Sequence, residues 1–220
     1  MASEQINSNR YNELTTNPKS SFFVGFQQNY LNFSRETLSI SSQEGGHMWG
    51  KKNTYIIPQK YDLLSNVYLK IFLPELTNGQ LGTAPGRISY VKAIGHALIK
   101  TVTIYINNVE IDTHTGLSMD LWSRLKGQSR HNLGGPAGVD TTAPEKHLLV
   151  PLQFWFCNDN SMALPCSREY IGNSEIKIVI DTRKFHELVC TDTGGYTESG
   201  VTIPTAATMS MLLTYISFDN

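Results

Sequence analysis

An almost uninterrupted apolar run, Leu148–Cys157, stands out in the pattern of hydrophobic and polar positions, because nine of its ten residues are apolar. The run has no helical period, contains a proline and is rich in aromatic and β-branched residues, which favours a buried strand. Alternation assigns Val150, Leu152, Phe154 and Phe156 to one wholly apolar face, which we expect to be core. The residues of the opposite face are Leu149, Pro151, Gln153, Trp155 and Cys157. This face is mostly apolar too, so we expect another part of the protein to cover it.

Strict alternation of apolar and polar residues recurs along the chain. Within residues 63–73, Val67, Leu69, Ile71 and Leu73 form one face, and Pro74 follows as a stop. After residues 88–96, a strong period of two leads to Ile106, and Asn107-Asn108 then predicts a short turn into a second strand of a hairpin. Further strands are predicted at 31–40, 52–57, 174–181 and 207–218.

A single segment, Leu117–Lys126, has helical spacing of its apolar residues, with Gly127 as a C-terminal stop. Thr115 or Ser118 is suited to cap its N-terminus. The apolar positions that define the helix are Leu117, Leu121, Trp122 and Leu125.

About eight strands, one short helix and long loops predict an all-β fold, an eight-stranded antiparallel jelly-roll sandwich. The immunoglobulin alternative is shorter and has paired cysteines. Residues 1–21 are polar and are expected to form an N-terminal arm, followed by one jelly-roll domain over 22–220. The expected loops cover 45–50, 77–86, 127–145 and 190–205.

Charge and composition narrow the possible partners. The formal net charge is −1, which gives no broad basic field for direct nucleic-acid binding. No apolar run is long enough to span a bilayer, and the N-terminus lacks an apolar signal core. The three cysteines, Cys157, Cys166 and Cys190, suggest free thiols in a reducing compartment, although a Cys157–Cys166 disulfide remains an alternative.

Motifs for chemistry are largely missing from the sequence. There is no GxSxG, P-loop or GxGxxG pattern, and the glycine-rich 134–138 segment contains a proline and no following Lys-Ser/Thr pair. Asp112 and His114 share a strand face, but two ligands do not make a metal site. We therefore expect no catalytic, cofactor-binding or metal-binding residues and no enzymatic activity. The remaining candidates, without a supporting pattern, are His47, His96, His131, His147, His186, Asp159, Glu169 and Asp181.

Apolar residues on the outer faces of the predicted strands are unusually frequent. Tyr68 and Phe72 oppose the core face of their strand, and Trp155 and Cys157 do so on theirs. The 207–218 strand is apolar on both faces. Large exposed apolar patches mark interaction surfaces, so self-assembly is one interpretation. The alternative is that loops 77–90 and 127–145 fold over the sheets.

Several ordered motifs resemble the major capsid proteins of nucleocytoplasmic large DNA viruses. They are Ile94-Gly-His-Ala-Leu-Ile99, the hairpin ending in Ile111-Asp-Thr-His114, the helix with Met119-Asp-Leu-Trp122, Leu149-Val-Pro-Leu-Gln-Phe-Trp-Phe156 followed by Met162-Ala-Leu-Pro165, and the closing strand Met211–Asp219. The resemblance covers about 90–219 well and 22–75 loosely.

The resemblance implies a structural shell protein. Members of the family carry two jelly rolls in tandem, and three copies form a capsomer that tiles an icosahedral shell. This sequence matches the first barrel. Either a second barrel of about two hundred residues follows Asn220, or the protein is a single-barrel penton or minor capsid component. Implied partners are copies of itself (a trimer, or a pentamer for a penton), neighbouring capsomers and minor capsid proteins, and an inner viral membrane; the implied location is the virion capsid, assembled in the host cytoplasm.

A carbohydrate-binding jelly roll is the competing hypothesis from another class. In that case aromatic side chains on a concave face, together with an exposed Trp49 in the 45–50 loop, would stack on sugars.

Overall fold

The computed structural model describes residues 32–43, 48–77, 88–127, 142–143, 145–172, 174–191 and 202–218. The chain divides into two compact units, one of residues 1–33 and 218–220 and one of residues 34–217. The fold described below is that of the second unit. The arm expected over residues 1–21 lies outside the described residues and stays a prediction.

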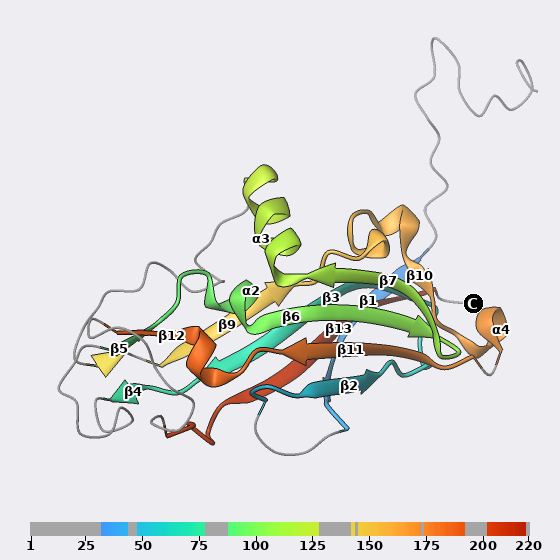
Figure 1. The fold of residues 1–220 in the computed structure, drawn as a ribbon. Coiled ribbons are helices and arrows are strands. Elements are labelled where there is room, and N and C mark those ends of the chain that lie inside the picture. The colour runs from blue at the N-terminus through green and yellow to red at the C-terminus, as the bar shows by residue number, and fades with distance from the viewer. Residues whose placement is uncertain are drawn as a thin grey trace, which may run out of the picture. The chain divides into compact units, whose positions relative to one another are not determined.

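Two antiparallel sheets form the body (Figure 1). In the first sheet, β3 (Leu63–Leu73) pairs with β13 (Thr208–Phe218) on one side and with β9 (Lys146–Pro151) and β10 (Leu164–Pro165) on the other, and β1 (Phe33–Ser41) pairs with β13. The second sheet has the order β2 (Lys52–Ile56), β11 (Ile176–Thr182), β6 (Ile99–Ile106) and β7 (Val109–Thr115). Two small pairs complete the described strands: β5 (Ile88–Tyr90) with β12 (Val189–Thr191), and β4 (Leu76–Thr77) with β8 (Thr142–Ala143).

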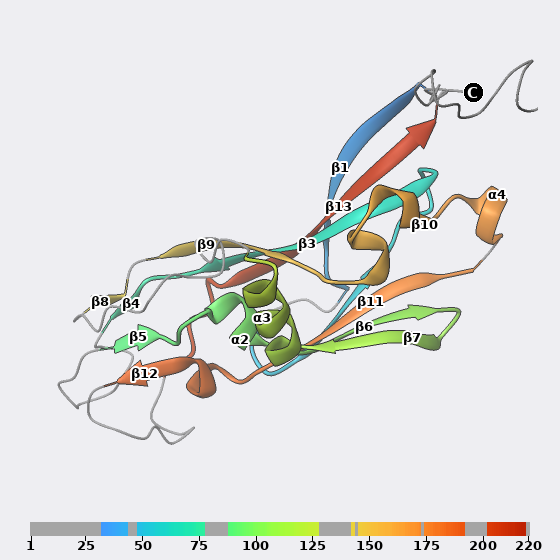
Figure 2. The same ribbon diagram turned by 90° about the horizontal axis from the view of Figure 1, so that it is seen from above.

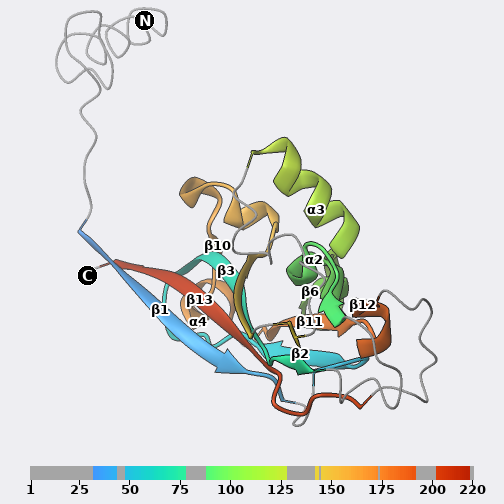
Figure 3. The ribbon, with the colours of Figure 1, turned by 90° about the vertical axis from the view of Figure 1, so that its left-hand side faces the viewer.

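The core lies between the two sheets, which Figure 3 shows as separate layers. The predicted face of β3, from Val67 to Leu73, is buried, and so are Ile176, Ile178 and Ile180 of β11. The strand β13, in the same sheet as β3, adds the buried side chains of Met211, Leu213 and Tyr215 to this core. Each large buried side chain contributes about 1.5–3 kcal/mol. The antiparallel sandwich predicted from alternation is confirmed.

The apolar run Leu148–Cys157 is only partly a strand. β9 ends at Pro151, the last ladder-like bond joins the Leu152 amide to the Val67 carbonyl, and Trp155–Cys157 form the 3-10 helix η3. The predicted strand over 152–157 is therefore wrong. The predicted burial is right, because Val150, Leu152, Phe154 and Phe156 are all inaccessible. The apolar composition of the run correctly indicated that it is buried. Its backbone conformation after Pro151 is instead set by local turn hydrogen bonds, such as the one from the Cys157 amide to the Phe154 carbonyl.

The predicted hairpin is present between β6 and β7. Asn107 and Asn108 form its two-residue turn, both with left-handed backbone (φ 50° and 64°), as a type I′ turn requires. The Asn107 side chain also bonds the neighbouring segment, since its Oδ1 accepts from the Glu175 amide at 3.0 Å. β7 is an edge strand of its sheet.

Helices are short and lie between strands. The described ones are α2 (Ile94–Leu98), α3 (Gly116–Leu125), α4 (Arg168–Ile171), η3, η4 (Asn160–Met162) and η5 (Phe185–Leu188). The predicted helix is α3, and the sequence did not predict the others. Thr115 caps it as expected, in a reciprocal capping box with Ser118. Within the described residues, no helix is long and apolar enough to cross a bilayer.

Candidate interaction surface

The histidine and carboxylate candidates do not gather into a site. Among the described residues, no group of three or more His, Cys, Asp or Glu side chains is placed to hold a metal ion. Asp112 and His114 are 3.0 Å apart and form a pair, and the His114 ring lies 5.5 Å from the Phe154 ring. The His114 side of this partly exposed pair therefore contacts the core residue Phe154. His47, His131 and the 134–138 segment lie outside the described residues.

The remaining described histidines and carboxylates make contacts that stabilise the local structure rather than converging on a common site. His147 stacks near Phe72, with ring centroids 4.9 Å apart, and His186 lies half-buried in η5. Asp159 accepts the Ser161 amide at 3.0 Å, and this bond lowers the pKa of its carboxyl. Asp181 pairs with Lys100 at 3.7 Å. The candidate Glu169 lies in α4.

The three cysteines are free thiols. Burial raises the pKa of Cys157 and of Cys166 to about 12, so both are protonated at neutral pH and unreactive. Cys190 is exposed. The disulfide alternative between Cys157 and Cys166 is not formed.

Trp49 lies in the core, which is a correction of the expectation that it is exposed. Only 3% of Trp49 is accessible, its Nε1 donates to the Pro204 carbonyl at 3.1 Å, and its ring packs edge-on against Phe185 at 5.1 Å. A buried indole offers no stacking platform. One of the two features that motivated the carbohydrate-binding hypothesis, the exposed Trp49, is therefore lost.

Helix α3 is anchored to the body through its small and polar side. A Cβ atom on Gly116 would lie 2.2 Å from the carbonyl oxygens of both His96 and Ile99, so α3 starts in direct contact with the backbone of α2. Asp120 of α3 faces the buried His96, with 3.6 Å between Oδ1 and Nδ1, and it holds Arg124 at 2.6 Å. The buried residues of α3 are Gly116, Met119 and Ser123.

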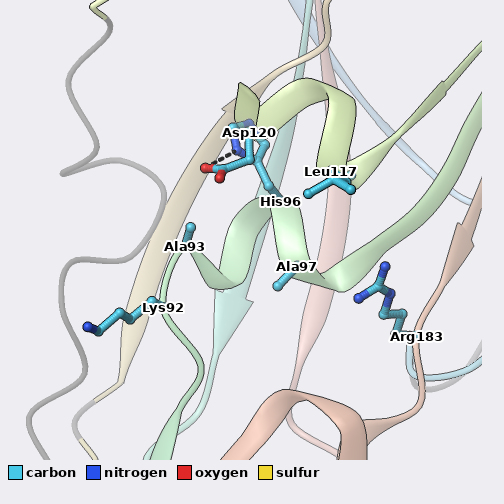
Figure 4. A pocket seen from close by; sticks show the side chains of 8 residues that line it. Lys92, Ala93, His96, Ala97, Leu117, Asp120 and Arg183 are labelled. Atoms are coloured by element: carbon cyan, nitrogen blue, oxygen red, sulfur yellow. Dashed lines mark ion pairs between the residues drawn. The ribbon is translucent and has the colours of Figure 1, made fainter. Parts of the chain in front are cut away.

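A pocket of about 310 Å³ opens beside this anchor (Figure 4). Figure 4 shows the ion pair of His96 and Asp120 at one side, with Lys92 and Arg183 on either side of the α2 segment. The pocket combines two cations with one carboxylate that is already paired. Its lining is Lys92, Ala93, His96, Ala97, Gly116, Leu117, Asp120 and Arg183.

The apolar side of α3 faces outward, contrary to the usual expectation that such a face packs on the core. Leu117 is 76% exposed, Leu121 57% and Leu125 73%, and Trp122 is exposed as well. Leu117, Leu121 and Leu125 are each four residues apart and so form one stripe along the helix. We call Leu117, Leu121, Trp122 and Leu125 the α3 ridge. Figures 1 and 3 show α3 projecting away from the strands of both sheets.

Trp122 is fixed at the side of the ridge. The Lys126 ammonium lies 5.0 Å from the Trp122 ring centroid and donates to the Asn158 side chain at 2.9 Å, which ties the end of α3 to the segment after η3. A second pocket, of about 210 Å³, lies between α3 and the segment around η3. It is lined by His114, Ser118, Met119, Trp122, Gln153 and Asn158.

The outer faces of the sheets are less exposed than the sequence suggested. Tyr68 and Phe72 are half-buried, as are Leu149 and Leu212 on the adjoining strands. Trp155 and Cys157 pack partly against the core, and Trp155 meets the Phe156 ring edge-on at 5.1 Å. Among the residues that the structure describes, the most exposed group of neighbouring large apolar side chains is therefore the α3 ridge.

A smaller apolar patch was missed by the sequence interpretation. Val109 is 60% exposed and Ile111 47% exposed, both on β7 next to the hairpin turn. In the sequence they alternate with Glu110 and Asp112, and this alternation was the available signal. In the structure Val109 pairs with Ile106, whereas the register shift in the β6–β7 ladder leaves Ile111 unpaired at a bulge of this edge strand.

Comparison with known proteins adds independent findings. Residues 21–219 match the family model described as major capsid protein N-terminus. The chain is 30% identical over 186 residues to the probable capsid protein 4 of Acanthamoeba polyphaga mimivirus, covering 79% of this chain and 36% of that protein. It is 31% identical over 163 residues to the major capsid protein of Pyramimonas orientalis virus, covering 69% of this chain and 39% of that one.

A solved structure shares the fold. The quasi-atomic model of the PBCV-1 virus capsid superposes with a TM-score of 0.68 at 20% identity, over 90% of this chain and 46% of that one. The present chain thus spans less than half the length of each of these three proteins.

Proposed function

Because this chain belongs to the major capsid protein family, we propose that it is a structural, non-enzymatic subunit of an icosahedral viral shell and that it acts by binding copies of itself. Its role is geometric: a rigid β-sandwich carries outward apolar surface that becomes buried between neighbours. The relatives named as capsid proteins support this role.

The observation that carries the proposal is the outward-facing α3 ridge. An amphipathic helix of a monomeric protein normally buries its apolar stripe. Here the close approach of Gly116 to α2 and the pairing of Asp120 with the buried His96 hold the opposite side of α3 against the body, which leaves the leucines facing outward. Fixed apolar exposure of this kind is typical of a surface that is covered in an assembly.

We further propose a trimeric capsomer, located in the virion capsid with minor capsid proteins and an inner membrane as neighbours. The family resemblance supports the trimer; a pentameric penton is the alternative. Assembly in the host cytoplasm is supported by the free thiols of Cys157 and Cys166, which suit a reducing compartment.

The test is the mass of the chain in solution. We expect light scattering after size-exclusion chromatography, over a range of protein concentrations, to give a defined oligomer, three copies for a capsomer or five for a penton. Electron microscopy of the same fractions should show ring-shaped particles. A chain that stays monomeric at every concentration would contradict the proposal.

A further inference from the structure

The pocket of about 310 Å³ beside α2 is lined by two cations, Lys92 and Arg183. Among the described residues, neither of them forms an ion pair with a carboxylate. Asp120, the acidic residue of the lining, is already engaged by Arg124 at 2.6 Å and by His96 at 3.6 Å. Because Asp120 and Arg124 neutralise each other, the pocket keeps an excess of positive charge.

The backbone on both sides of Lys92 is held in place. The Val91 amide donates to the Leu188 carbonyl at 3.0 Å, and the Ala93 carbonyl accepts two amides of α2 at 3.0 Å. Ala93 has a left-handed backbone (φ 52°), which is uncommon for a residue other than glycine. The exposed side chain of Lys92 therefore starts from a fixed point at the edge of the pocket.

Arg183 reaches the same pocket from a distant part of the sequence. It follows β11, whose pairing with β6 shifts register between Asp181 and Thr182, and such a bulge redirects nearby side chains. The Arg183 amide donates to the Leu98 carbonyl at 2.9 Å, and its carbonyl accepts from the Gly50 amide at 3.0 Å. Figures 1 and 2 place α2 beside η5, which comes shortly after Arg183. The half-buried Arg183 is thus held by backbone contacts as well.

The space between the two cations has a low, apolar floor. Figure 4 shows Ala93 and Ala97 between Lys92 and Arg183, with Leu117 on the α3 side. Alanine side chains let a ligand approach the backbone closely, and Leu117, which is 76% exposed, offers an apolar contact. This relief suits a narrow chain that is apolar in its middle and carries a negative charge toward each cation.

The carboxylates of this chain are poorly arranged to fill the pocket of a second copy. They are spread so evenly along the sequence that Glu110 and Asp112 are the one pair fewer than five positions apart. Asp112 is paired with His114 at 3.0 Å, and Glu110 accepts the Thr113 hydroxyl at 2.8 Å. A partner of different sequence therefore matches the pocket better than a copy of this chain does.

The spacing of the charges favours a peptide over a nucleic acid. A DNA strand in a duplex carries a phosphate about every 3.4 Å, so its charges would face Asp120 as well as the two cations. An acidic peptide can place its carboxylates at the cations and an uncharged residue beside Asp120. The described lining also contains no Phe, Tyr or Trp side chain on which a base could stack.

We propose that this pocket is a docking site for an acidic segment of a protein other than this chain. Carboxylates of the segment pair with Lys92 and Arg183, and an apolar side chain between them packs on Leu117. This site lies beyond the proposed self-association and does not depend on it.

Fluorescence anisotropy with labelled synthetic peptides tests the site on the 220-residue chain. A helix is about 10–12 Å across, so an extended peptide of about nine residues, at about 3.3 Å each, is long enough to cross α2. The probe has glutamates at both ends and a central leucine, and matched peptides carry glutamine or lysine in place of glutamate. At low salt the glutamate peptide should bind roughly tenfold tighter than the glutamine peptide, because two surface ion pairs contribute about two- to fivefold each. Added salt should weaken this binding.

Variants of the two cations locate the binding. Lys92→Gln and Arg183→Gln should each weaken binding of the glutamate peptide by about two- to fivefold. The double variant Lys92→Glu/Arg183→Glu should reverse the preference and bind the lysine peptide instead. Lys70→Gln, which removes an exposed cation of β3 outside the lining, is the matched control and should bind like the parent chain. Circular dichroism and thermal unfolding should be alike in all of these proteins.

Several outcomes would overturn the proposal. They are equal affinity for the glutamate and glutamine peptides, a charge reversal that leaves the preference unchanged, and no peptide binding at millimolar concentration. Tighter binding of a single-stranded oligonucleotide, lost in the Lys92 and Arg183 variants, would assign the pocket to nucleic acid instead. Light scattering of the same samples measures self-association separately, so either proposal can fail while the other stands.

Discussion

Gly116 at the start of α3 lies so close to α2 that a Cβ atom there would come within 2.2 Å of the His96 carbonyl oxygen. Backbone atoms cannot move aside as a flexible side chain can. We therefore expect Gly116→Ala to destabilise the fold by about 3 kcal/mol or more, above the usual range for overpacking. Urea unfolding monitored by tryptophan fluorescence measures this loss.

The control for that substitution is Gly127→Ala. Gly127 has a left-handed backbone (φ 63°) but nothing within 4 Å of an added Cβ atom. Its replacement should cost only about 1 kcal/mol, from backbone strain alone. Equal losses at the two positions would show that the α2–α3 contact is looser than the structure describes.

The capping box at the start of α3 gives a second prediction. Thr115 Oγ1 accepts the Ser118 amide at 3.2 Å, and Ser118 Oγ accepts the Thr115 amide at 3.0 Å. Thr115→Ala removes the cap and should destabilise by about 1 kcal/mol. Thr115→Ser retains the hydroxyl and should recover most of that loss. Thermal unfolding of both variants measures the difference, and no recovery would argue against a capping role.

The two asparagines of the hairpin turn should respond differently to glycine. Both have left-handed backbone, which glycine adopts without strain. Asn108→Gly removes only an exposed hydrogen bond from the Lys177 ammonium and is therefore expected to be close to neutral. Asn107→Gly also removes bonds to the Ser174 hydroxyl and the Glu175 amide, and should destabilise by about 1 kcal/mol. Chemical denaturation of the pair decides the order, and the reverse order would contradict it.

Substitutions in the core and in the α3 ridge should differ strongly in their effect on the free energy of unfolding. Phe156 is inaccessible and stacks 5.6 Å from Phe154, so Phe156→Ala should cost about 3–5 kcal/mol. Leu125→Ala removes an exposed side chain and should change the unfolding free energy by less than about 0.5 kcal/mol. A large stability loss for Leu125→Ala would mean that the ridge packs within its own chain.

Alkaline pH should destabilise the protein through its buried acids. Burial raises the pKa of Cys157 and Cys166 from the ordinary 9.0 to about 12, and it raises the pKa of Tyr90 and Tyr215 as well. In this range the unfolded chain loses these protons first, so stability is fully present below about pH 9 and falls as the pH rises from 9 toward 12. Each thiol contributes at most about 1.4 kcal/mol per pH unit.

Unfolding measured at a series of pH values between 8 and 11 checks this dependence. The double variant Cys157→Ala/Cys166→Ala should have a shallower decline above pH 9, with the tyrosines responsible for what remains. Cys190→Ala, at an exposed position, is the control and should leave the slope unchanged. An identical slope in all three proteins would remove the thiols as its cause.

The sheets could be predicted from the sequence because apolar and polar residues that alternate indicate a strand with one buried face. β3 was placed at Leu63–Leu73 with its core face correct, and the β6–β7 hairpin followed from its two asparagines. The run to Cys157 failed as a strand beyond Pro151, because burial on both sides of a chain does not distinguish a strand from a short 3-10 turn.

The interaction surface could be predicted only in part. Helical spacing located the apolar side of α3, but it cannot say whether that side packs on its own chain or on a neighbour. The decisive facts, the close approach of Gly116 to α2 and the pairing of Asp120 with His96, join residues about twenty positions apart in the sequence. The sequence placed Trp155 on the outer face of a strand. In the structure its ring packs edge-on against the neighbouring Phe156, which spacing along the sequence does not indicate.

The direct junction of β7 and α3 has a consequence for where the α3 ridge is held. Thr115 ends the strand and Gly116 begins the helix, with no residue between them, so the strand acts as a ruler of seven residues, about 23 Å at 3.3 Å each. This length sets how far the α3 ridge lies from the hairpin turn. Inserting one residue would lengthen the strand by about 3 Å and turn its side chains to the opposite side. The placement of the outward-facing leucines is thus determined by the residue count of a single strand.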